Sequence, residues 1–265
     1  MSMNRSSSSS DQEQFIVFEE VPLSQIAPKF TTPFNQETTI GIVTINKPEK
    51  MNALCVKTAQ QFRDLFTSDK IMKNKNLGCI VLTGAPSKTP GVKSAFSAGG
   101  DFDFLLERCN DQPYNNSGRM IQFYNSFLEP LLKFSPVPTI SALNGHAVGA
   151  GLAISLATDV RFAETSAKLG VNFVNIGLSP ALEIGMVYEV VEGEDKLREK
   201  ALDYAARIAR NPPIATKLCL KNLRMQQIQG LEQMITREAD AQAQAYADPI
   251  LKETITNLKK KSEKK

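Results

Sequence analysis

The chain has 265 residues, a hydrophobic content of 42% and a net charge of +3, which is enough for one large domain or a domain with a small appendage. No run approaches the roughly 18 consecutive apolar residues of a membrane span, so we expect a soluble protein with no membrane span. The positive charge belongs to the C-terminus, where six lysines and two glutamates follow Leu251. This pattern indicates a basic tail over 258–265, either solvated or in contact with phosphate groups, rather than a nucleic-acid-binding face.

Cysteine usage and the two ends of the sequence bear on the compartment. The four cysteines are scattered without a Cys-x-x-Cys pair, which is typical of reduced thiols in an intracellular protein. The N-terminus is polar and low in complexity, and it lacks the apolar core of a secretion signal. The last three residues are not a peroxisomal tripeptide. We expect an intracellular protein, with mitochondrial matrix, cytosol and peroxisome all open, and a disordered or irregular extension over 1–38.

The first regular elements are predicted as strand, helix, strand. A β-branched, alternating run covers 39–46, and a short apolar run ended by glycine covers 78–84. Between them, apolar residues recur at helical spacing from Ala53 to Phe66. A further helix, MIQFYNSFLEPLLKF over 120–134, precedes a strand at 138–145. The Ala-rich helix at 149–158 precedes a last predicted strand at 159–164. This alternation predicts an α/β fold built from repeating β-β-α turns.

Helices dominate the C-terminal part. One stripe runs from Leu197 to Ile208. A second helix follows the Asn-Pro-Pro sequence, with Asn211 as the expected N-cap and Pro212 in the first turn. The last amphipathic helix runs from Leu231 to Tyr246 and is broken by Pro249. We therefore predict a β-β-α core over 39–192 and a helical region over 193–257.

Two glycine-rich segments are candidates for chemistry. The first, AFSAGGDFDFL over 95–105, leaves a strand and opens a helix at Asp101, whose side chain can cap free N–H groups. The second, NGHAVGAGLAISLATD over 144–159, also passes from a loop into a helix. Two helix starts without bulky side chains can together hold one oxygen atom, as an oxyanion hole does. The structural alternative is that these glycines only permit tight turns and close packing.

Other site types fit the sequence poorly. The glycines of the second segment have the wrong order for a dinucleotide fingerprint. A Ser-His-Asp hydrolase would have to use His146, the only histidine, and no Gly-x-Ser-x-Gly elbow occurs. One histidine and unpaired cysteines cannot form a zinc shell, so no metal is expected. We interpret His146 as a loop residue near the site rather than as a general base.

The two segments in their order, together with TINKPEKMNAL upstream and READAQAQAYAD near the C-terminus, resemble the crotonase superfamily, the enoyl-CoA hydratases and isomerases. The resemblance covers roughly Thr39 to Asn257. It implies a crotonase-like spiral of β-β-α units with a C-terminal helical region that packs against neighbours in a homotrimer or hexamer. It also implies that the partner is an acyl-CoA thioester, with coenzyme A as part of the substrate and no further cofactor.

The resemblance also implies roles for individual residues. The two backbone N–H groups that hold the thioester oxygen match Gly100 and Ala150. The positions that bind the acyl-CoA substrate match two short segments, which contain Met51, Asn52, Ala53 and Leu54, and Ala98, Gly99 and Asp101.

The acid/base residues expected from the resemblance are missing. Hydratases of this family have glutamates at the positions that match Ala153 and Phe173, and a related isomerase branch has one at the position of Ala181. Between Pro180 and Ala181 about thirty residues of the family pattern are absent, roughly two helices with their turns. We expect these absent helices to cover the acyl pocket in relatives, so that apolar residues near Phe173, Val174 and Ile176 become partly bare.

Three functional interpretations follow. The leading one is an acyl-CoA-binding enoyl-CoA hydratase/isomerase-family protein with enolate-type chemistry on a CoA thioester. The second is a non-catalytic acyl-CoA-binding or assembly-only variant. The third, a serine peptidase with the same spiral fold, lacks a Ser/His/Asp set.

Overall fold

Two sheets organise the computed structural model, which describes residues 13–171, 174–176, 181–182 and 185–263. The larger sheet has the strand order β1-β2-β3-β5-β7-β10, and the smaller sheet has the order β4-β6-β8-β9. The larger sheet contains β1 (Ile16–Pro22), β2 (Thr39–Ile45), β3 (Leu77–Gly84), β5 (Thr139–Leu143), β7 (Val160–Glu164) and β10 (Glu189–Val191). The smaller one contains β4 (Ala95–Ser97), β6 (His146–Val148), β8 (Leu169–Val171) and β9 (Val174–Ile176).

The chain alternates between the sheets in a β-β-α repeat. Each repeat places its first strand in the larger sheet and its second in the smaller one, as β3 and β4, β5 and β6, and β7 and β8. Successive first strands pair in parallel, and so do successive second strands. Because each repeat is stacked on the previous one, equivalent loops of neighbouring repeats lie next to each other. This arrangement confirms the predicted α/β fold class.

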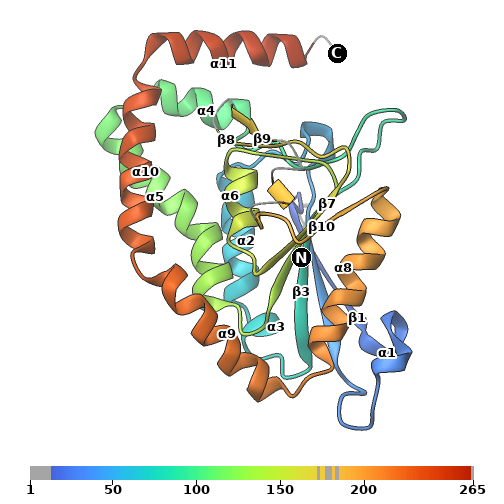
Figure 1. Cartoon of the computed structure of the whole chain (residues 1–265). Helices are drawn as coiled ribbons and strands as arrows, with labels where there is room; N and C mark the ends of the chain where they lie inside the picture. The colour runs from blue at the N-terminus through green and yellow to red at the C-terminus, as the bar shows by residue number, and fades with distance from the viewer. Residues whose placement is uncertain (1–12, 172–173, 177–180, 183–184, 264–265) are drawn as a thin grey trace, which may run out of the picture.

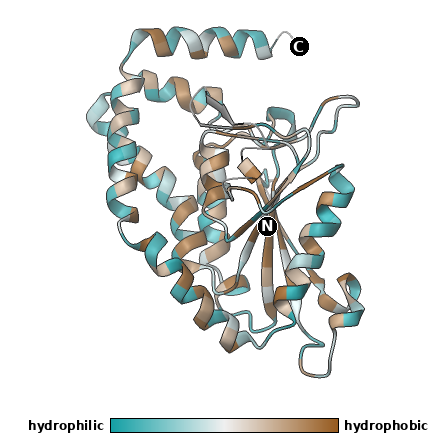
Figure 2. Ribbon diagram, in the orientation of Figure 1, coloured by the Kyte–Doolittle hydropathy of each residue, from teal (hydrophilic) through white to brown (hydrophobic). Residues whose placement is uncertain are grey.

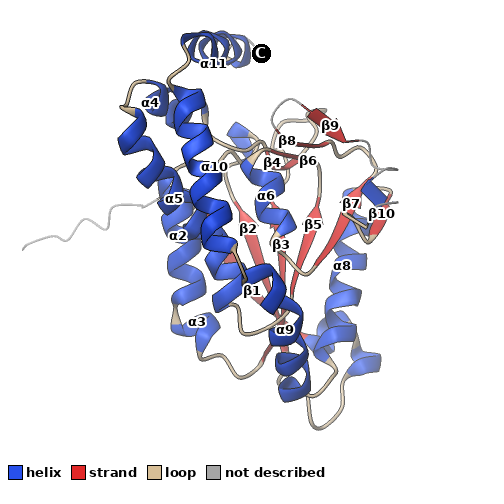
Figure 3. Cartoon of the chain, turned by 60° about the vertical axis from the view of Figure 1, so that its left-hand side comes forward, coloured by secondary structure: helices blue, strands red, loops and turns tan. Residues whose placement is uncertain are grey.

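Helices cover both faces of the larger sheet (Figure 1 and Figure 3). On one face lie α2 (Val56–Thr67), α5 (Pro113–Glu129), α6 (Ala150–Leu156) and α10 (Leu231–Tyr246), and on the other lies α8 (Glu194–Ala209). The remaining helices are α1 (Leu23–Ile26), α3 (Asp69–Met72), α4 (Phe102–Cys109), α9 (Pro213–Ile228) and α11 (Pro249–Ser262), with short turns η1 (Pro28–Phe30), η2 (Pro48–Lys50) and η3 (Pro130–Phe134).

Strand alternation divides the interior into two apolar cores. In β3, Ile80 and Leu82 face the core under α2 and α5, whereas Cys79 and Val81 face the core under α8. Residues on both faces of a central parallel strand are buried, which explains its continuous apolar sequence. In Figure 2, apolar residues lie along the sheet and hydrophilic residues lie on the outer sides of the helices.

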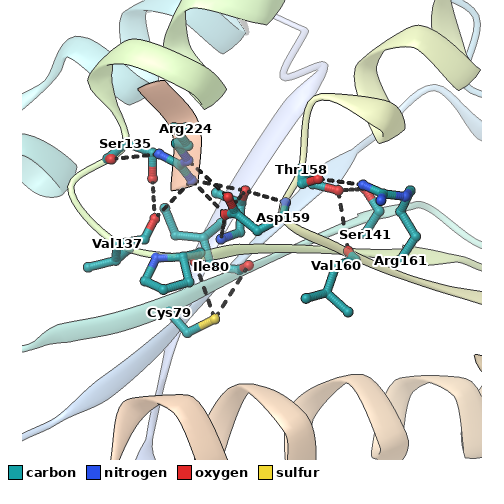
Figure 4. A network of polar contacts seen from close by, with 12 residues as sticks. Cys79, Ile80, Ser135, Val137, Ser141, Thr158, Asp159, Val160, Arg161 and Arg224 are labelled. Carbon is teal, nitrogen blue, oxygen red and sulfur yellow. Dashed lines mark hydrogen bonds and ion pairs between the residues drawn. The ribbon is translucent and has the colours of Figure 1, made fainter. Parts of the chain in front are cut away.

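A buried ion pair anchors α9 to the sheet (Figure 4). The Arg224 guanidinium donates to both carboxylate oxygens of Asp159, at 2.9 and 2.6 Å, and to the carbonyl oxygen of Ser135 at 3.0 Å. Asp159 also accepts hydrogen bonds from the backbone N–H and the hydroxyl of Thr139. Only 3% of Arg224 is exposed, so this pair connects the C-terminal helices to β5 and to the turn before β7.

The structure corrects three sequence predictions at element ends. Residues 16–22 form β1 inside the region predicted as irregular, because the backbone of β1 pairs along its length with β2. The N-cap of α9 is Pro212, and the Asn211 side chain instead donates to the last carbonyls of α8, at Arg207 and Ile208. Pro249 opens α11, with the Asp248 side chain as N-cap, and this helix includes part of the predicted basic tail. The proposed boundary between the core and the helical region stays a prediction.

Candidate active site

The two glycine-rich loops predicted to act together lie side by side. β4 pairs with β6, so the loops that follow these strands leave the smaller sheet at the same edge. The first loop approaches the second at Gly99, where a Cβ would lie 2.7 Å from the carbonyl oxygen of Val148 and 3.6 Å from the nitrogen of Ala150. Gly99 has φ +86°, a conformation that side chains with a Cβ rarely adopt. The close approach therefore depends on glycine at this position.

Each loop presents a backbone N–H group that makes no hydrogen bond within the described part of the chain. Leu54 donates to the carbonyl of Gly99 and accepts from Asp101. In such a parallel bridge the N–H of the intervening Gly100 points to the opposite side. Ala150 is the first residue of α6, so its N–H has no acceptor within the helix. Both groups are donors of the kind that an oxyanion hole uses.

The predicted coenzyme A segments are brought together by backbone pairing. Ala98 donates to the carbonyl of Met51 at 3.0 Å, and Leu54 donates to that of Gly99 at 2.7 Å. The fully buried Asn52 donates to the carbonyls of Ala85 and Ala95. Two segments about 45 residues apart in the sequence therefore form one structural unit beside the Gly100 N–H.

Several side chains of this unit are buried and stabilise the loop. Leu54 is fully buried, as Asn52 is, and Ala53 is 6% exposed. Met51, at 40% exposed, is the side chain among Met51–Leu54 that remains open to contact with a ligand.

Asp101 caps α4 and binds two lysines. Its carboxylate accepts from the N–H of Asp103 at 2.9 Å, and from the ammonium groups of Lys47 at 2.7 Å and Lys50 at 3.1 Å. Burial alone would raise the pKa of Asp101, but the hydrogen bonds from Lys47, the Asp103 amide and Lys50 outweigh burial and lower this pKa. The predicted helix start at Asp101 is confirmed by this cap.

A cavity of about 330 Å³ opens at the start of α6. It lies between three helices. The lining residues are Tyr124 and Leu128 of α5, Gly149, Ala150 and Ala153 at α6, and Leu231, Met234, Ile235, Glu238 and Gln242 of α10. Since Ala150 lines this space, the start of α6 lies beside a largely apolar volume. Gly100 does not line it; a Cβ at Gly100 would lie 2.9 Å from the Leu105 side chain.

One part of the cavity wall is polar. The Gln242 amide donates to the hydroxyl of Tyr124 at 2.6 Å and to Oε1 of Glu238 at 2.8 Å. Burial raises the pKa of Tyr124 to about 12, although the Gln242 hydrogen bond acts in the opposite direction. Tyr124 therefore stays protonated at neutral pH and keeps its own O–H for a further acceptor. These three residues were not predicted as site residues; the four-residue spacing of Glu238 and Gln242 in READAQAQAYAD is the signal that could have found them.

His146 does not line this cavity. It begins β6, and its Nδ1 accepts a hydrogen bond from the backbone N–H of Lys168 at 3.2 Å. Burial lowers the pKa of His146, and the charges of Lys168 and Lys93 act in the same direction. The predicted loop position of His146 is therefore wrong, because it pairs within strand β6. That it is not the general base stays a prediction.

Two of the three positions without the expected glutamate are described. Ala153 lines the cavity one turn beyond Ala150, where its methyl group can neither donate nor accept a proton. Ala181 is fully buried, and its carbonyl accepts from Val187. Phe173 and Pro180 lie outside the described residues, and so do the side chains of Val174 and Ile176.

Comparison with known proteins identifies related chains. Residues 35–183 match the family model described as enoyl-CoA hydratase/isomerase. The Bacillus subtilis protein YngF carries an enoyl-CoA hydratase/isomerase name. The chain is 31% identical to it over an alignment of 210 positions, gaps included, which takes up 67% of this chain and 75% of YngF. The chain is 25% identical to the short-chain-enoyl-CoA hydratase of Clostridium acetobutylicum over an alignment of 252 positions, gaps included. This alignment takes up 83% of this chain and 91% of that protein.

A solved structure has the same fold. The enoyl-CoA hydratase/isomerase of Mycobacterium paratuberculosis superposes with a TM-score of 0.73 at 17% identity, over 94% of this chain and all of that one.

The clostridial alignment also fits the predicted shortening. It spans 252 positions but takes up 83% of 265 residues, about 220, so about 32 positions of the hydratase have no counterpart here. Among helices of the described residues, none has the length and hydrophobicity needed to cross a membrane.

Proposed function

Since the chain belongs to the enoyl-CoA hydratase/isomerase family, we propose that it binds an acyl-CoA thioester and promotes enolate-type chemistry next to the thioester carbonyl. In this proposal the N–H groups of Gly100 and Ala150 hold the carbonyl oxygen, and the acyl chain occupies the cavity between α5, α6 and α10. The observation that carries it is the position of Ala150, whose N–H is unpaired: the residue lines the cavity, and its nitrogen lies 3.6 Å from a Cβ placed on Gly99.

The chemistry follows from the two donors. Loss of a proton next to a thioester carbonyl places negative charge on the carbonyl oxygen. Fixed N–H groups stabilise that charge without reorganising, and removal of one oxyanion-hole donor typically costs about 3–4 kcal/mol in the transition state. The coenzyme A part would lie along the unit formed by Met51–Leu54 and Ala98–Asp101, with Met51 and Ala98 as the contacting residues. Asn52, Leu54 and Asp101 would stabilise this unit from within.

The test combines binding with turnover. Titration of the protein with an acyl-CoA, followed by calorimetry, should show saturable binding that Gly100→Val weakens, because a β-branched side chain would displace Leu105 and disturb the start of α4. Crotonyl-CoA and a 3-enoyl-CoA, offered separately, distinguish hydration from double-bond isomerisation. Absence of saturable acyl-CoA binding would refute the proposal. Binding without turnover of either substrate would favour the non-catalytic alternative, which the comparisons do not support.

We further propose that the chain assembles as a homotrimer or hexamer. Large apolar side chains of α9 are exposed, among them Ile214, Leu218, Leu223 and Met225, and α9 lies on the outside of the molecule (Figure 1). An exposed apolar surface of this kind is typical of a protein–protein contact. Light scattering coupled to size exclusion would give the mass, and a monomer at micromolar concentration would contradict the proposal.

A further inference from the structure

A stripe of α10 forms one wall of the cavity. Leu231, Met234, Ile235, Glu238 and Gln242 follow one another at intervals of one, three or four residues, so they lie on one side of the helix. The first part of this stripe is apolar, and the last part carries a carboxylate and an amide. The polar part of the stripe borders both the cavity and solvent, because Glu238 is exposed.

Glu238 is the only carboxylate among the described residues that line the cavity. Its Oε1 accepts from the Gln242 amide, whereas its Oε2 makes no hydrogen bond within the described part of the chain. The residue is exposed, so a proton taken up by its carboxylate can exchange with water. Oε2 therefore remains free to accept a proton.

Gln242 holds this arrangement in place. Its one amide nitrogen donates to both Glu238 and Tyr124, so it links the exposed carboxylate to the buried Tyr124 of α5. Because Gln242 occupies the Tyr124 oxygen as a donor, the Tyr124 O–H can itself donate to an acceptor in the cavity. The wall thus combines one proton acceptor, Glu238, with one hydroxyl donor, Tyr124.

Ala150 and Ala153 line the same cavity from α6. If the thioester oxygen is held at the Ala150 N–H, the α-carbon lies two bonds from that oxygen and inside the space that Glu238 also lines. Ala153 leaves room there, because its side chain ends at Cβ. The carboxylate of α10 can then act on the α-carbon from the cavity wall.

We propose that Glu238 is the catalytic proton carrier of this site, with Gln242 and Tyr124 as positioning residues. The proposal rests on the proposed function. Glu238 Oε2 takes a proton from the α-carbon, and the electron pair of the broken C–H bond moves toward the carbonyl, whose oxygen becomes the enolate oxygen. Return of the proton to the same carbon restores the thioester, and its delivery to the γ-carbon of a 3-enoyl-CoA shifts the double bond. Neither path needs a second carboxylate or a cofactor.

The test is α-hydrogen exchange in D₂O with butyryl-CoA as the probe, followed by mass spectrometry. This probe has no double bond, so exchange reports proton abstraction alone. The wild-type protein should incorporate deuterium, and Glu238→Gln should lower the rate by at least about 100-fold, since a positioned acid/base group contributes typically 10²–10⁴-fold. Glu238→Asp keeps the carboxylate but withdraws it by one methylene, so an intermediate rate is expected.

Glu232→Gln is the matched control, because Glu232 is an exposed residue of the same helix that does not line the cavity. It should leave exchange unchanged. Titration with butyryl-CoA is run on every variant, and far-UV circular dichroism checks folding. If Glu238→Gln does not fold, the test uses the exchange rates of Glu238→Asp and Glu232→Gln. A lower rate in Glu238→Asp than in Glu232→Gln supports the role of Glu238, and equal rates contradict it.

The outcomes separate the two proposals. Wild-type exchange with equal exchange in Glu238→Gln would overturn the role of Glu238 and leave the proposed function intact. Binding of butyryl-CoA by the wild type without any exchange would also overturn it. Failure of the wild type to bind butyryl-CoA would refute the proposed function, and the role of Glu238 with it. Equal losses in Glu238→Gln and Glu232→Gln would indicate a general effect of charge on α10 and would also contradict the assignment.

Discussion

Gly99 is the residue at which the two loops of the candidate site come closest, so Gly99→Ala tests their geometry directly. This substitution is expected to lower the free energy of unfolding in two ways. The first is backbone strain, because φ is +86° and a left-handed conformation costs a residue with a Cβ about 1–2 kcal/mol. The second is a clash, because the new Cβ would lie 2.7 Å from the Val148 carbonyl oxygen. A carbon and an oxygen without a hydrogen bond require more space, so the loops must separate by several tenths of an ångström.

Gly91→Ala separates these two costs. Gly91 also has a positive φ, +76°, but a Cβ there would meet no atom within 4 Å. It therefore carries the strain without the clash. Overpacking typically adds about 1–3 kcal/mol, and for a chain of this size each kcal/mol lowers the melting temperature by about 2–4 °C. Gly99→Ala should melt below Gly91→Ala by a few degrees to about 10 °C.

The functional readout is α-hydrogen exchange in butyryl-CoA, since displacement of a catalytic group by about 1 Å can cost 10²-fold in rate. Gly99→Ala moves the Ala150 N–H relative to the first loop, whereas Gly91→Ala leaves it in place. Exchange should therefore fall in the first variant and persist in the second. Equal melting temperatures and equal exchange rates in the two variants would refute the contact between the loops as a determinant of the site.

Three further predictions concern the buried and charged groups. Arg224→Met leaves the Asp159 carboxylate without its partner and should cost about 3–5 kcal/mol in urea unfolding; adding Asp159→Asn should cost less than the sum of the single changes, and additive losses would contradict a direct pair. The pKa of His146 is lowered in the folded state, so the unfolded chain binds the proton more readily and stability should decline as pH falls through about 6.5. His146→Gln should flatten this decline without abolishing α-hydrogen exchange, and complete loss of exchange would make His146 a catalytic residue. The pKa of Asp101 is also lowered, so its contribution to stability is present above about pH 4 and disappears as pH falls further; Asp101→Asn should lower stability at pH 7 and leave less of it to be lost in acid, as thermal melts at several pH values would show.

Local sequence patterns determined most of the regular elements. The apolar runs at 39–46 and 78–84 became β2 and β3, because strands buried on both faces require continuous apolar residues. The helix predicted over 231–246 has the bounds of α10, since a glycine precedes it and its apolar stripe has helical spacing. The order of the glycine-rich motifs was enough to identify the family. The N-terminal region was misjudged because β1 gains its structure from pairing with β2, a contact that its own sequence does not reveal.

Tertiary structure decided which residues share the candidate site. The sequence placed Gly100 and Ala150 together only through the family resemblance, and pairing of β4 with β6 explains their proximity. The family resemblance implied that Asn52 and Leu54 contact coenzyme A, but their side chains are fully buried. Glu238 lies more than 80 residues from Ala150 in the chain and reaches the same cavity because α10 packs across α5. Helical periodicity indicates which side of α10 is apolar, but the identity of the wall it faces depends on packing between distant elements.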